Sequence, residues 1–514
     1  MRLRVGIDVG GTNTDAVLMS DRELVASFKT PTTEDVTSGV VTALGGVLGG
    51  AGGLGSGVAA VMIGTTHFTN AVVQRRDLAP TAILRLGLPA TQSLPPMVDW
   101  PDDLREASGN HSYLAKGGLE FDGRPISPID PAELRAIARD IAARGLENVA
   151  VSAVFSPIKP EAELDAIEIL REVLPEARYT ASCQIGRTGL LERENAAILN
   201  ASLRVLGGRI VGAFRQALAD FGLQAPLYFT QNDGTLMSAE YVERFPVLTI
   251  ASGPTNSMRG AAFLSGLKEA IVVDIGGTTS DIGALHYGFP REASVAVEVG
   301  GVRTNFRMPD ILSIGLGGGS VVSEQPFGIG PRSVGFRLSQ EALVFGGRTL
   351  TATDLVVAGG LAAVGERERV RHLPADLVEK GLGWIQEHLS ASVEKVLLSP
   401  EPIPVIVVGG GSILAKDAIA GLPVIRPAHY QVANAVGAAI AQVSGETDRV
   451  YALSDLPRER ALEEARFLAT QAAVDAGADP ATVEIVDVED VPLAYLPGNA
   501  TRIRVKAVGE VQLA

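Results

Sequence analysis

The sequence predicts an α/β protein built from two copies of one unit, which form two lobes around a cleft, with a small α+β segment at the C-terminus. Two observations carry most of this prediction. The run Val5–Val17 (VGIDVGGTNTDAV) returns in the same register at Ile271–Gly283 (IVVDIGGTTSDIG), and internal repetition of this kind indicates a duplicated unit. In addition, short apolar strands alternate with amphipathic helices through most of the chain, which is typical of α/β domains.

Each copy of the repeat reads as a buried strand that ends at a pair of glycines. The β-branched residues before the glycines favour a strand, and the Gly-Gly pair permits a tight turn. Hydroxyl and amide side chains follow, and backbone N–H groups in such a turn form a concave site that suits phosphate oxygens. We therefore predict two loops that grip one nucleotide from both sides, made by Gly10, Gly11, Thr12 and Asn13 and by Gly276, Gly277, Thr278 and Thr279.

Carboxylates flank both turns at equivalent positions. Asp8 and Asp274 stand just before the glycines, where they could hold Mg²⁺, an ion that takes one or two protein carboxylates and keeps several waters. Asp15 and Asp281 follow the turns and complete the set of candidate catalytic carboxylates. A single Asp-x-Gly-Gly run is as often an ordinary hairpin turn, but two copies in register favour a functional pair.

Composition narrows the classes of function. The chain holds 44 Lys and Arg against 59 Asp and Glu, a formal charge of −15, and without a basic cluster this charge opposes binding to nucleic acid or to an anionic membrane. The single cysteine, Cys183, excludes an internal disulfide and a four-thiolate metal site within one chain. The sequence starts directly with a predicted strand rather than a signal peptide, so a cytoplasmic protein is expected.

One stretch, residues 36–74, carries no Asp, Glu, Lys or Arg and is long enough to span a bilayer. Its middle is dense in glycine, however, and glycine destabilises a helix while adding little hydrophobicity. A helix from Thr37 to about Leu48, a glycine-rich loop and a strand over Val58–Ile63 explain it better. Residues 50–55 match the pattern G-x-G-x-x-G, but no strand precedes them, so a flexible loop is favoured over a dinucleotide site.

Residues 1–183 form the first predicted domain. The strand Val58–Ile63 leads into a run of hydroxyl residues in which Thr65 and Thr66 are candidate substrate contacts. His67 follows them, and we expect a capping or packing role for it because no acid–base partner is nearby. Alternation of strands and helices continues through Thr81–Leu86, Pro131–Ala143, Val149–Phe155, Pro160–Leu174 and Tyr179–Ser182.

Residues 184–444 form the second predicted domain, which opens with a long amphipathic helix over Leu190–Phe221. The solvated face of this helix is expected to hold Glu194, Asn195 and Asn200. The strand Leu227–Thr230 then ends at polar residues, among which Asn232 is a further candidate substrate contact.

Two glycine-rich segments of this domain are additional candidates for binding. Gly315–Ser320 contains no lysine and so is not a P-loop. It could line a ligand or let two backbones pass closely, and we favour a cofactor contact at Gly317 and Gly318. Asp310, just before this segment, is a candidate for substrate or metal. A second strand runs into glycines where a purine or ribose could lie against bare backbone, at Gly409, Gly410 and Gly411.

The end of the chain reads as a separate small unit. A helix over Gln431–Ser444 is expected to close the second domain. Residues 445–514 then form the small α+β appendage, with a helix over Arg458–Ala476 and strands near Val483–Val488 and Thr501–Val508.

These motifs together resemble a known family. The two strand–Asp-x-Gly-Gly-Thr turns and the late Val-Val-Gly-Gly-Gly-Ser strand end resemble the phosphate and adenosine elements of the actin-like (ribonuclease H-like) ATPases, the superfamily of actin, hexokinase and the heat-shock ATPases. More narrowly, the chain from Arg2 to Val443 resembles the hydantoinase A/5-oxoprolinase family. The ordered motifs are the two repeats, Gly64-Thr-Thr-His-Phe-Thr-Asn-Ala, Arg193-Glu-Asn, Gln231-Asn-Asp-Gly, Ala251-Ser-Gly-Pro254 and Gly315-Leu-Gly-Gly-Gly-Ser320.

The resemblance implies ATP- and Mg²⁺-dependent opening of a cyclic amide, such as a hydantoin or a lactam. In this family the ring carbonyl oxygen is thought to be phosphorylated before the C–N bond is hydrolysed. Many members are longer or act with a separate hydantoinase B-type subunit, and no such module is found in this sequence. We therefore expect an oligomeric assembly in which this chain provides the ATP-using half.

Two alternatives stay open at this point. A small-molecule kinase of the same superfold would release a stable phosphorylated product. An ATP-driven activator subunit would turn over ATP only with a protein partner, although the iron–sulfur activators of this superfold need more thiolates than Cys183 supplies.

Overall fold

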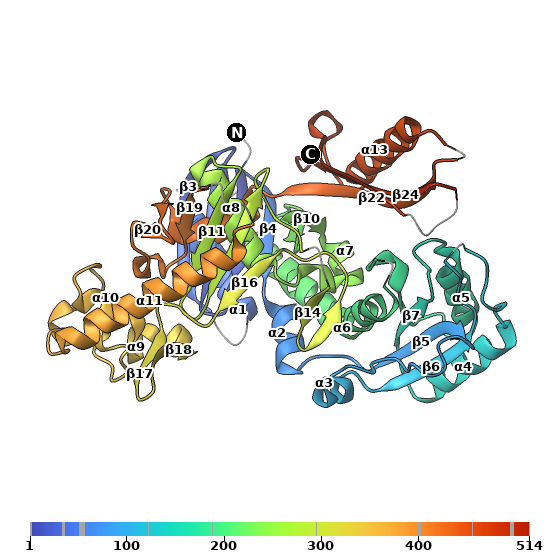
Figure 1. Ribbon diagram of the computed structural model, residues 1–514, viewed down its shortest axis with the longest axis horizontal. Coiled ribbons are helices and arrows are strands. Elements are labelled where there is room, and N and C mark those ends of the chain that lie inside the picture. The colour runs from blue at the N-terminus through green and yellow to red at the C-terminus, as the bar shows by residue number, and fades with distance from the viewer. Residues whose placement is uncertain are drawn as a thin grey trace.

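Two sheets, each built around one copy of the repeat, form the centre of the molecule (Figure 1). The computed structural model describes residues 3–32, 36–50, 57–121, 123–187, 189–293, 296–398, 402–454, 456–493 and 498–512. Residues 33–35, which precede the helix expected from Thr37, and most of the glycine-rich loop at 50–55 lie outside these ranges.

The first sheet has nine strands in the order β23-β24-β22-β10-β9-β4-β1-β2-β3. The repeat makes the antiparallel hairpin β1–β2, and β4 pairs with β1 in parallel. Its strands are β1 (Leu3–Val9), β2 (Asn13–Ser20), β3 (Glu23–Pro31), β4 (Val58–Thr65), β9 (Leu227–Thr230), β10 (Thr235–Ser238), β22 (Gln442–Ala452), β23 (Glu484–Pro492) and β24 (Ala500–Gly509).

The second sheet repeats this arrangement. Its hairpin β11–β12 is antiparallel, and β19 pairs with β11 in parallel, as β4 does with β1. The shared topology confirms the predicted duplication and the α/β fold class. Its strands are β11 (Ala270–Ile275), β12 (Ser280–His286), β13 (Phe289–Pro290), β16 (Ile311–Ile314), β19 (Val405–Val408), β20 (Ala418–Ile419) and β21 (Leu422–Ile425).

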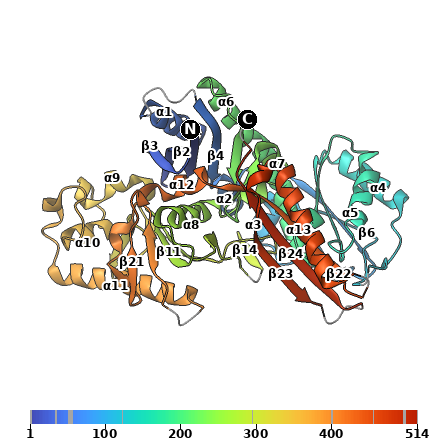
Figure 2. The ribbon, with the colours of Figure 1, turned by 90° about the horizontal axis from the view of Figure 1, so that it is seen from above.

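Two helices, α8 (Ser252–Ser265) and α12 (Ala433–Ala439), lie between the two sheets (Figure 2). They approach closely because each presents a glycine to the backbone of the other. A Cβ atom on Gly260 would lie 2.6 Å from the carbonyl carbon of Ala433, and one on Gly437 would lie 2.7 Å from that of Asn256. Close packing of this kind is open only to residues without a side chain.

The helix expected over Gln431–Ser444 is shorter than predicted. It ends at Ala439, and β22 begins at Gln442 with alternately half-buried and buried residues. Polar residues alternate with apolar or small ones over Gln442–Glu446, and this period of two overrides the helical reading. β22 pairs in parallel with β10, so the C-terminal segment continues the first sheet.

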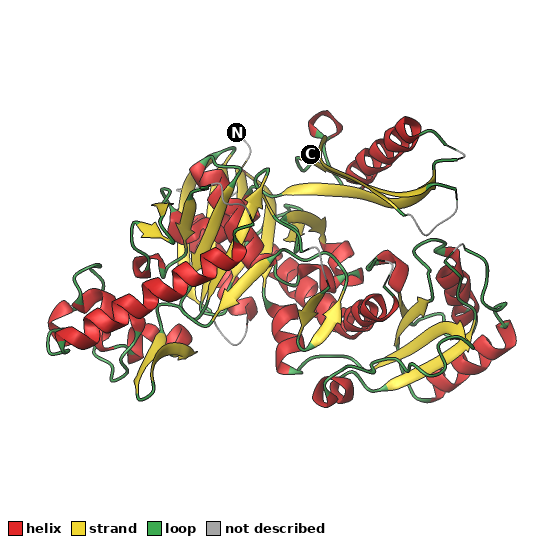
Figure 3. Ribbon diagram, viewed as in Figure 1, coloured by secondary structure: helices red, strands yellow, loops and turns green. Residues whose placement is uncertain are grey.

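A separate four-stranded parallel sheet lies at one end of the molecule, with helices packed on it (Figures 1 and 3). Three of its strands and both helices follow the predicted alternation, whereas the strand at His111–Lys116 was not predicted. They are β5 (Thr81–Leu88), β6 (His111–Lys116), β7 (Asn148–Ala153) and β8 (Arg178–Ala181), with α4 (Pro131–Ala143) and α5 (Glu161–Arg171). The domain boundaries at 183 and 444 stay a prediction, and the nine-stranded sheet contains strands from both sides of each.

The long helix α6 (Leu190–Asp220) corrects one expectation. Glu194, Asn195 and Asn200 are at most 1% exposed rather than solvated. Glu194 forms a buried ion pair with Arg85, and Asn200 donates a hydrogen bond of 3.1 Å to the Thr180 hydroxyl. The prediction failed because this helix is covered on several sides, so polar residues on it pair inside the protein instead of facing water.

Among the described residues, α6 alone is long and apolar enough to cross a membrane, by length and composition only. Two thirds of its most apolar stretch, 67%, is buried inside the molecule. Glu194 is ion-paired and Asn195 and Asn200 are hydrogen-bonded inside the protein, as expected for a helix of the core.

The remaining elements connect or cover these sheets, and α13 packs on the C-terminal strands. They are α1 (Val36–Gly50), α2 (His67–Gln74), α3 (Asp102–Ala107), α7 (Ala239–Arg244), β14 (Val297–Val299), β15 (Val302–Thr304), β17 (Ser320–Glu324), β18 (Phe327–Ser333), α9 (Leu338–Glu341), α10 (Ala352–Ala358), α11 (Ala375–Val396) and α13 (Arg458–Asp475).

Candidate nucleotide site between the two repeats

The two copies of the repeat fold into the same hairpin. In the first, the Gly10 N–H donates to the Asn13 carbonyl at 3.0 Å, and in the second the Gly276 N–H donates to the Thr279 carbonyl at 2.9 Å. The strand register places Asp8 opposite Asp15 in the first hairpin, and Asp274 stands opposite Asp281 in the second. Equivalent sequence has therefore produced equivalent turns, each with a carboxylate on both strands.

The two turns face each other. A Cβ atom added to Gly277 would lie 3.1 Å from the Thr12 side chain, so the first loop reaches the backbone of the second. The carboxylates are also close enough to interact, since Asp15 contributes to raising the pKa of Asp274, although burial is the larger cause. The predicted pair of opposed loops is thus formed.

Asp8 is held in place by amide groups from the two helices between the sheets. Asn256 on α8 donates to Asp8 Oδ1 at 2.8 Å and also to the Thr230 hydroxyl at 3.0 Å. Asn434 on α12 donates to Asp8 Oδ2 at 3.1 Å and to Asp15 Oδ2 at 2.9 Å. These bonds fix both oxygens of a carboxylate that is only 3% exposed.

Burial dominates the electrostatics of the site. It raises the pKa of Asp8 to about 7, an effect that the hydrogen bond from Asn256 partly offsets and the nearby Asp15 increases. Burial likewise raises the pKa of Asp281 to about 6, against a hydrogen bond from Ser313. Among the described residues, the cation that pairs with these carboxylates is Lys29 on β3, whose ammonium lies 2.7 Å from Asp15 Oδ1. Carboxylates therefore outnumber cations, which suits a bound metal ion.

The donor set fits Mg²⁺ and a nucleotide. Asn256 Oδ1, beside Asp8, is buried and has no hydrogen-bond partner among the described residues, so it is available to a metal-bound water. The same part of the chain contains no group of three or more His, Cys, Asp or Glu side chains arranged around one metal position. Mg²⁺ needs only one or two carboxylates and keeps its waters, and Asp8 and Asp274 are the candidates.

Both later glycine segments pack against the second loop. A Cβ atom on Gly317 would lie 2.6 Å from the Thr278 nitrogen, and the Gly318 N–H already donates to the Gly276 carbonyl at 3.0 Å. The Gly411 N–H donates to the Ile275 carbonyl at 2.7 Å. A Cβ atom on Gly409 would collide with the Asp274 carboxylate, whereas Gly410 has open space around it. Gly410 is therefore the member of this set with room for a nucleoside.

Thr65 and Thr66 lie beside the first loop. The Thr66 hydroxyl donates to the carbonyl of Val9 at 3.1 Å, and the Thr65 hydroxyl contacts the ring of His67. Burial lowers the pKa of His67 to about 4, so its ring is neutral at physiological pH. Its placement agrees with the expected packing role.

The other two predicted substrate residues are used differently. Asn232 is 2% exposed and holds backbone together, because its N–H donates to the Leu248 carbonyl at 2.8 Å and its amide donates to the Arg307 carbonyl. Asp310 is exposed and forms an ion pair with Arg291 at 2.7 Å. It directly precedes β16. The start of β16 pairs with Gly283, and only its far end, at Ile314, pairs with Ser280 beside the second loop.

Several residues of the site were not anticipated. Lys29 could have been found, because a hairpin of β2 and β3 places it opposite Asp15. Asn256, Ser257 and Asn434 carry no comparable signal, since they reach the carboxylates only through the packing of α8 and α12 between the sheets.

Comparison with known proteins agrees with the motif order. The family model described as the hydantoinase/oxoprolinase N-terminal region matches residues 4–174, and the model described as hydantoinase/oxoprolinase matches residues 193–396. Caprolactamase subunit alpha of Pseudomonas jessenii is 27% identical over 393 residues, which are 70% of this chain and 55% of that protein. Acetophenone carboxylase gamma subunit of Aromatoleum aromaticum is 26% identical over 398 residues, 69% of this chain and 53% of that protein.

Solved structures show the same fold over the whole chain. The crystal structure of ATP-dependent caprolactamase from Pseudomonas jessenii aligns with 99% of this chain and 88% of that chain, with a TM-score of 0.78 at 20% identity. The nucleotide-free structure of acetone carboxylase aligns with 100% of this chain and 88% of that chain, with a TM-score of 0.69 at 18% identity.

The chain spans about half the length of the curated relatives that it matches. The two family models follow each other in the predicted order and together cover well over half of the residues. The chain therefore belongs to the hydantoinase/oxoprolinase family.

Proposed function

We propose that this chain is the ATP-using component of a cyclic-amide hydrolase, which phosphorylates the carbonyl oxygen of a hydantoin or lactam. The observation that carries the proposal is the pair of equivalent loops that face each other with carboxylates on both sides. Two opposed phosphate loops suit one nucleotide, and the relative named caprolactamase acts, as its name says, on a lactam.

The chemistry explains why ATP would be needed. An amide carbonyl is a poor electrophile because nitrogen donates electron density into it. Transfer of a phosphoryl group to the oxygen withdraws that density and leaves a carbon that water can attack, after which the ring C–N bond breaks. Enzymes promote phosphoryl transfer mainly by positioning the reactants and neutralising charge.

The residues of the site divide this work among them. Bound Mg²⁺–ATP would supply the phosphoryl group and the counter-charge for its oxygens. Asp8 and Asp274 would hold the metal, and Asn256 and Asn434 keep Asp8 in one orientation. The two glycine turns would hold the phosphates through backbone N–H groups. Lys29, beside Asp15, would place a positive charge near the transferred group.

Hydrolysis of the activated ring is assigned to a second subunit. The described residues hold no group of three or more His, Cys, Asp or Glu side chains that could bind a hydrolytic metal ion in addition to the Mg²⁺ of the nucleotide, and the relatives are named as subunits. We therefore propose a hydantoinase B-type partner that attacks the phosphorylated ring.

The test is ATP turnover by the purified chain with Mg²⁺ against hydantoins, 5-oxoproline and larger lactams, with and without a candidate B-type subunit. Stimulation by one ring compound supports the proposal and identifies the substrate class. A stable phosphorylated product that survives addition of the partner would instead indicate a kinase. Turnover that needs only a protein partner would indicate an activator.

A second candidate function is activation of a ketone for carboxylation. It is favoured by the similarity to the gamma subunit of acetophenone carboxylase and the beta subunit of acetone carboxylase, which is 23% identical over 437 residues. Caprolactam, acetone and acetophenone share a carbonyl oxygen, so the same phosphorylation would serve both reactions. Bicarbonate-dependent ATP turnover with ketones, and none with lactams, would decide for this candidate.

A further inference from the structure

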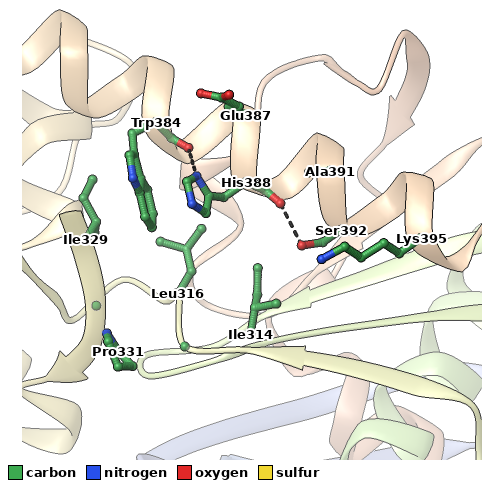
Figure 4. A pocket seen from close by; sticks show the side chains of 12 residues that line it. Ile314, Leu316, Ile329, Pro331, Trp384, Glu387, His388, Ala391, Ser392 and Lys395 are labelled. Carbon is green, nitrogen blue, oxygen red and sulfur yellow. Dashed lines mark hydrogen bonds between the residues drawn. The ribbon is translucent and has the colours of Figure 1, made fainter. Parts of the chain in front are cut away.

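A pocket of about 480 Å³ lies on the outer side of the second lobe, between α11, the end of β16 and the middle of β18 (Figure 4). One face of α11 forms its upper wall, because Trp384, His388, Ala391 and Lys395 recur at helical spacing. Its size falls within the roughly 300–1,000 Å³ of small-molecule sites.

The pocket is separate from the nucleotide site. Gln386 on α11 binds the Leu414 carbonyl at 2.6 Å, so that flank of the helix faces the segment after Gly409–Gly411. Residues two apart on a helix point in nearly opposite directions, about 200° apart. Trp384 and His388 therefore lie on the flank of α11 that faces away from the nucleoside glycines.

The lining combines an apolar body with a few polar groups. Ile314, Leu316 and Pro331 form an apolar floor, and the rings of Trp384 and His388 stack at 3.4 Å with an angle of 19° between them (Figure 4). A ligand with a flat ring would complete such a wall by stacking and by burying apolar surface.

The polar groups favour a negative charge on the ligand. Lys395 lines the pocket, and no ion pair of its ammonium occurs within the described part of the chain. Glu387 also lines the pocket, but its carboxylate points away from Leu316 and from the Lys395 ammonium (Figure 4). The Ser392 hydroxyl proton is already donated to the His388 carbonyl at 2.7 Å. His388 Nδ1 lies 2.9 Å from the Trp384 carbonyl and so donates its proton there. The charged donor of the pocket is therefore the Lys395 ammonium, which would pair with one carboxylate.

The floor of the pocket is also joined to the second phosphate loop. The Ser280 hydroxyl, at the end of that loop, donates to the Leu316 carbonyl at 2.6 Å. Three residues further along, the Gly319 N–H donates to the Gly277 carbonyl at 2.7 Å. A ligand that presses on the Leu316 side chain would act on the segment that supports the phosphate turn.

We propose that this pocket binds a small carboxylate with a flat apolar ring, and that binding changes the affinity of the second loop for nucleotide. The coupling rests on the proposed nucleotide site, whereas binding to the pocket does not. Coupling between two sites is reciprocal, so nucleotide must change the affinity for the carboxylate by the same factor.

The experiment titrates the full chain with 1-naphthoate, using 1-naphthalenemethanol as the uncharged analogue. Binding is measured by calorimetry and by quenching of tryptophan fluorescence, and Trp384→Phe identifies the contribution of the pocket. We expect Lys395→Met to weaken naphthoate binding by roughly ten- to a hundredfold, the value of a charged hydrogen bond. Lys159→Met, an exposed lysine in the first lobe, is the matched control and should change nothing.

A second variant fills the pocket without removing a core contact. Ala391 is exposed on α11, and Ala391→Leu should abolish naphthoate binding while the melting temperature stays within a few degrees of the wild type. Equal binding of naphthoate and the alcohol, or wild-type binding by Lys395→Met or Ala391→Leu, would overturn the site. The naphthoate titration is then repeated in the presence of ATP and of ADP. If the chain binds nucleotide but its affinity for naphthoate does not change, the coupling is overturned. If the chain does not bind nucleotide, that result counts against the proposed function instead.

Discussion

Replacing Gly437 by alanine tests the central claim that the helix crossing positions the carboxylates. The added Cβ would lie 2.7 Å from the carbonyl carbon of Asn256 and 2.8 Å from the nitrogen of Gly260, and closer still to the Asn256 oxygen. These atoms belong to the α8 backbone, which cannot rotate aside as a side chain can. The two helices must therefore separate by a substantial fraction of an ångström.

The expected cost follows from opposing contributions. Overpacking a buried site usually costs about 1–3 kcal/mol, and contact with backbone places this case at the upper end. Alanine in place of glycine in a helix returns about 1 kcal/mol. We therefore expect a net loss of about 2 kcal/mol in the free energy of unfolding. Displacement of α12 also draws Asn434 away from Asp8 and Asp15, so nucleotide affinity should fall as well.

Gly212→Ala provides the matched control. Gly212 lies on α6, is exposed, and would meet no atom within 4 Å after addition of a Cβ. This variant should gain roughly 0.5–1 kcal/mol, because it lowers the entropy of the unfolded chain without strain. The stability of both variants is measured by urea unfolding, and their binding of ATP by calorimetry. If Gly437→Ala proved as stable as Gly212→Ala and bound ATP with wild-type affinity, the helix crossing would have no role in shaping the site.

Three further predictions concern charged groups. Asp8→Asn and Asp274→Asn should each abolish ATP turnover while the far-ultraviolet circular dichroism stays unchanged, and full activity in both would disprove their assignment to Mg²⁺. Lys29→Met should weaken binding of ATP by about tenfold and leave ADP affinity nearly unchanged, because its charge is proposed to lie near the transferred phosphate; equal loss for both nucleotides would contradict that position. Burial acts to raise the pKa of Asp233, but the Lys506 ammonium at 2.7 Å outweighs it and lowers the pKa to about 2. The ion pair therefore stabilises the folded state at pH values above the unfolded pKa near 4, and this stability is lost as the pH falls toward 2. Asp233→Asn should cost about 2 kcal/mol in the free energy of unfolding at pH 7 and almost nothing at pH 2. Urea unfolding across that pH range measures the difference.

Much of the fold could be predicted because its signals are local. The repeat, the strand–helix alternation and the C-terminal strands depend on periodicity and on turn residues, and the structure reproduces them within a few residues. One exception, at Gln431–Ser444, arose where a helix ends directly before a strand. Small residues occur on both sides of that junction, so composition does not mark it. The strand β6 and the helix α11 were not predicted either.

The candidate site was predicted only in part, because half of it depends on tertiary packing. The glycines and aspartates of the loops lie within each repeat and were recognised from it. Asn256 and Asn434 lie far from the loops in sequence and meet Asp8 only where α8 and α12 cross. The buried Glu194 on α6 shows the same limit, because its partner Arg85 lies on β5, in the separate four-stranded sheet.

The helix α8 relates the two loops to each other. Adjacent residues of α8 reach the two equivalent acids: Asn256 donates to Asp8, and Ser257 is hydrogen-bonded to Asp274. Because residues on one helix turn are held rigidly, the separation of the two acids is set by α8 more than by contact between the flexible turns. The symmetry of the repeat thus ends at this helix, which gives Asp8 an amide and Asp274 a hydroxyl. Exchange of these two partners, as Asn256→Ser with Ser257→Asn, should therefore impair metal and nucleotide binding even though every residue type of the site is retained.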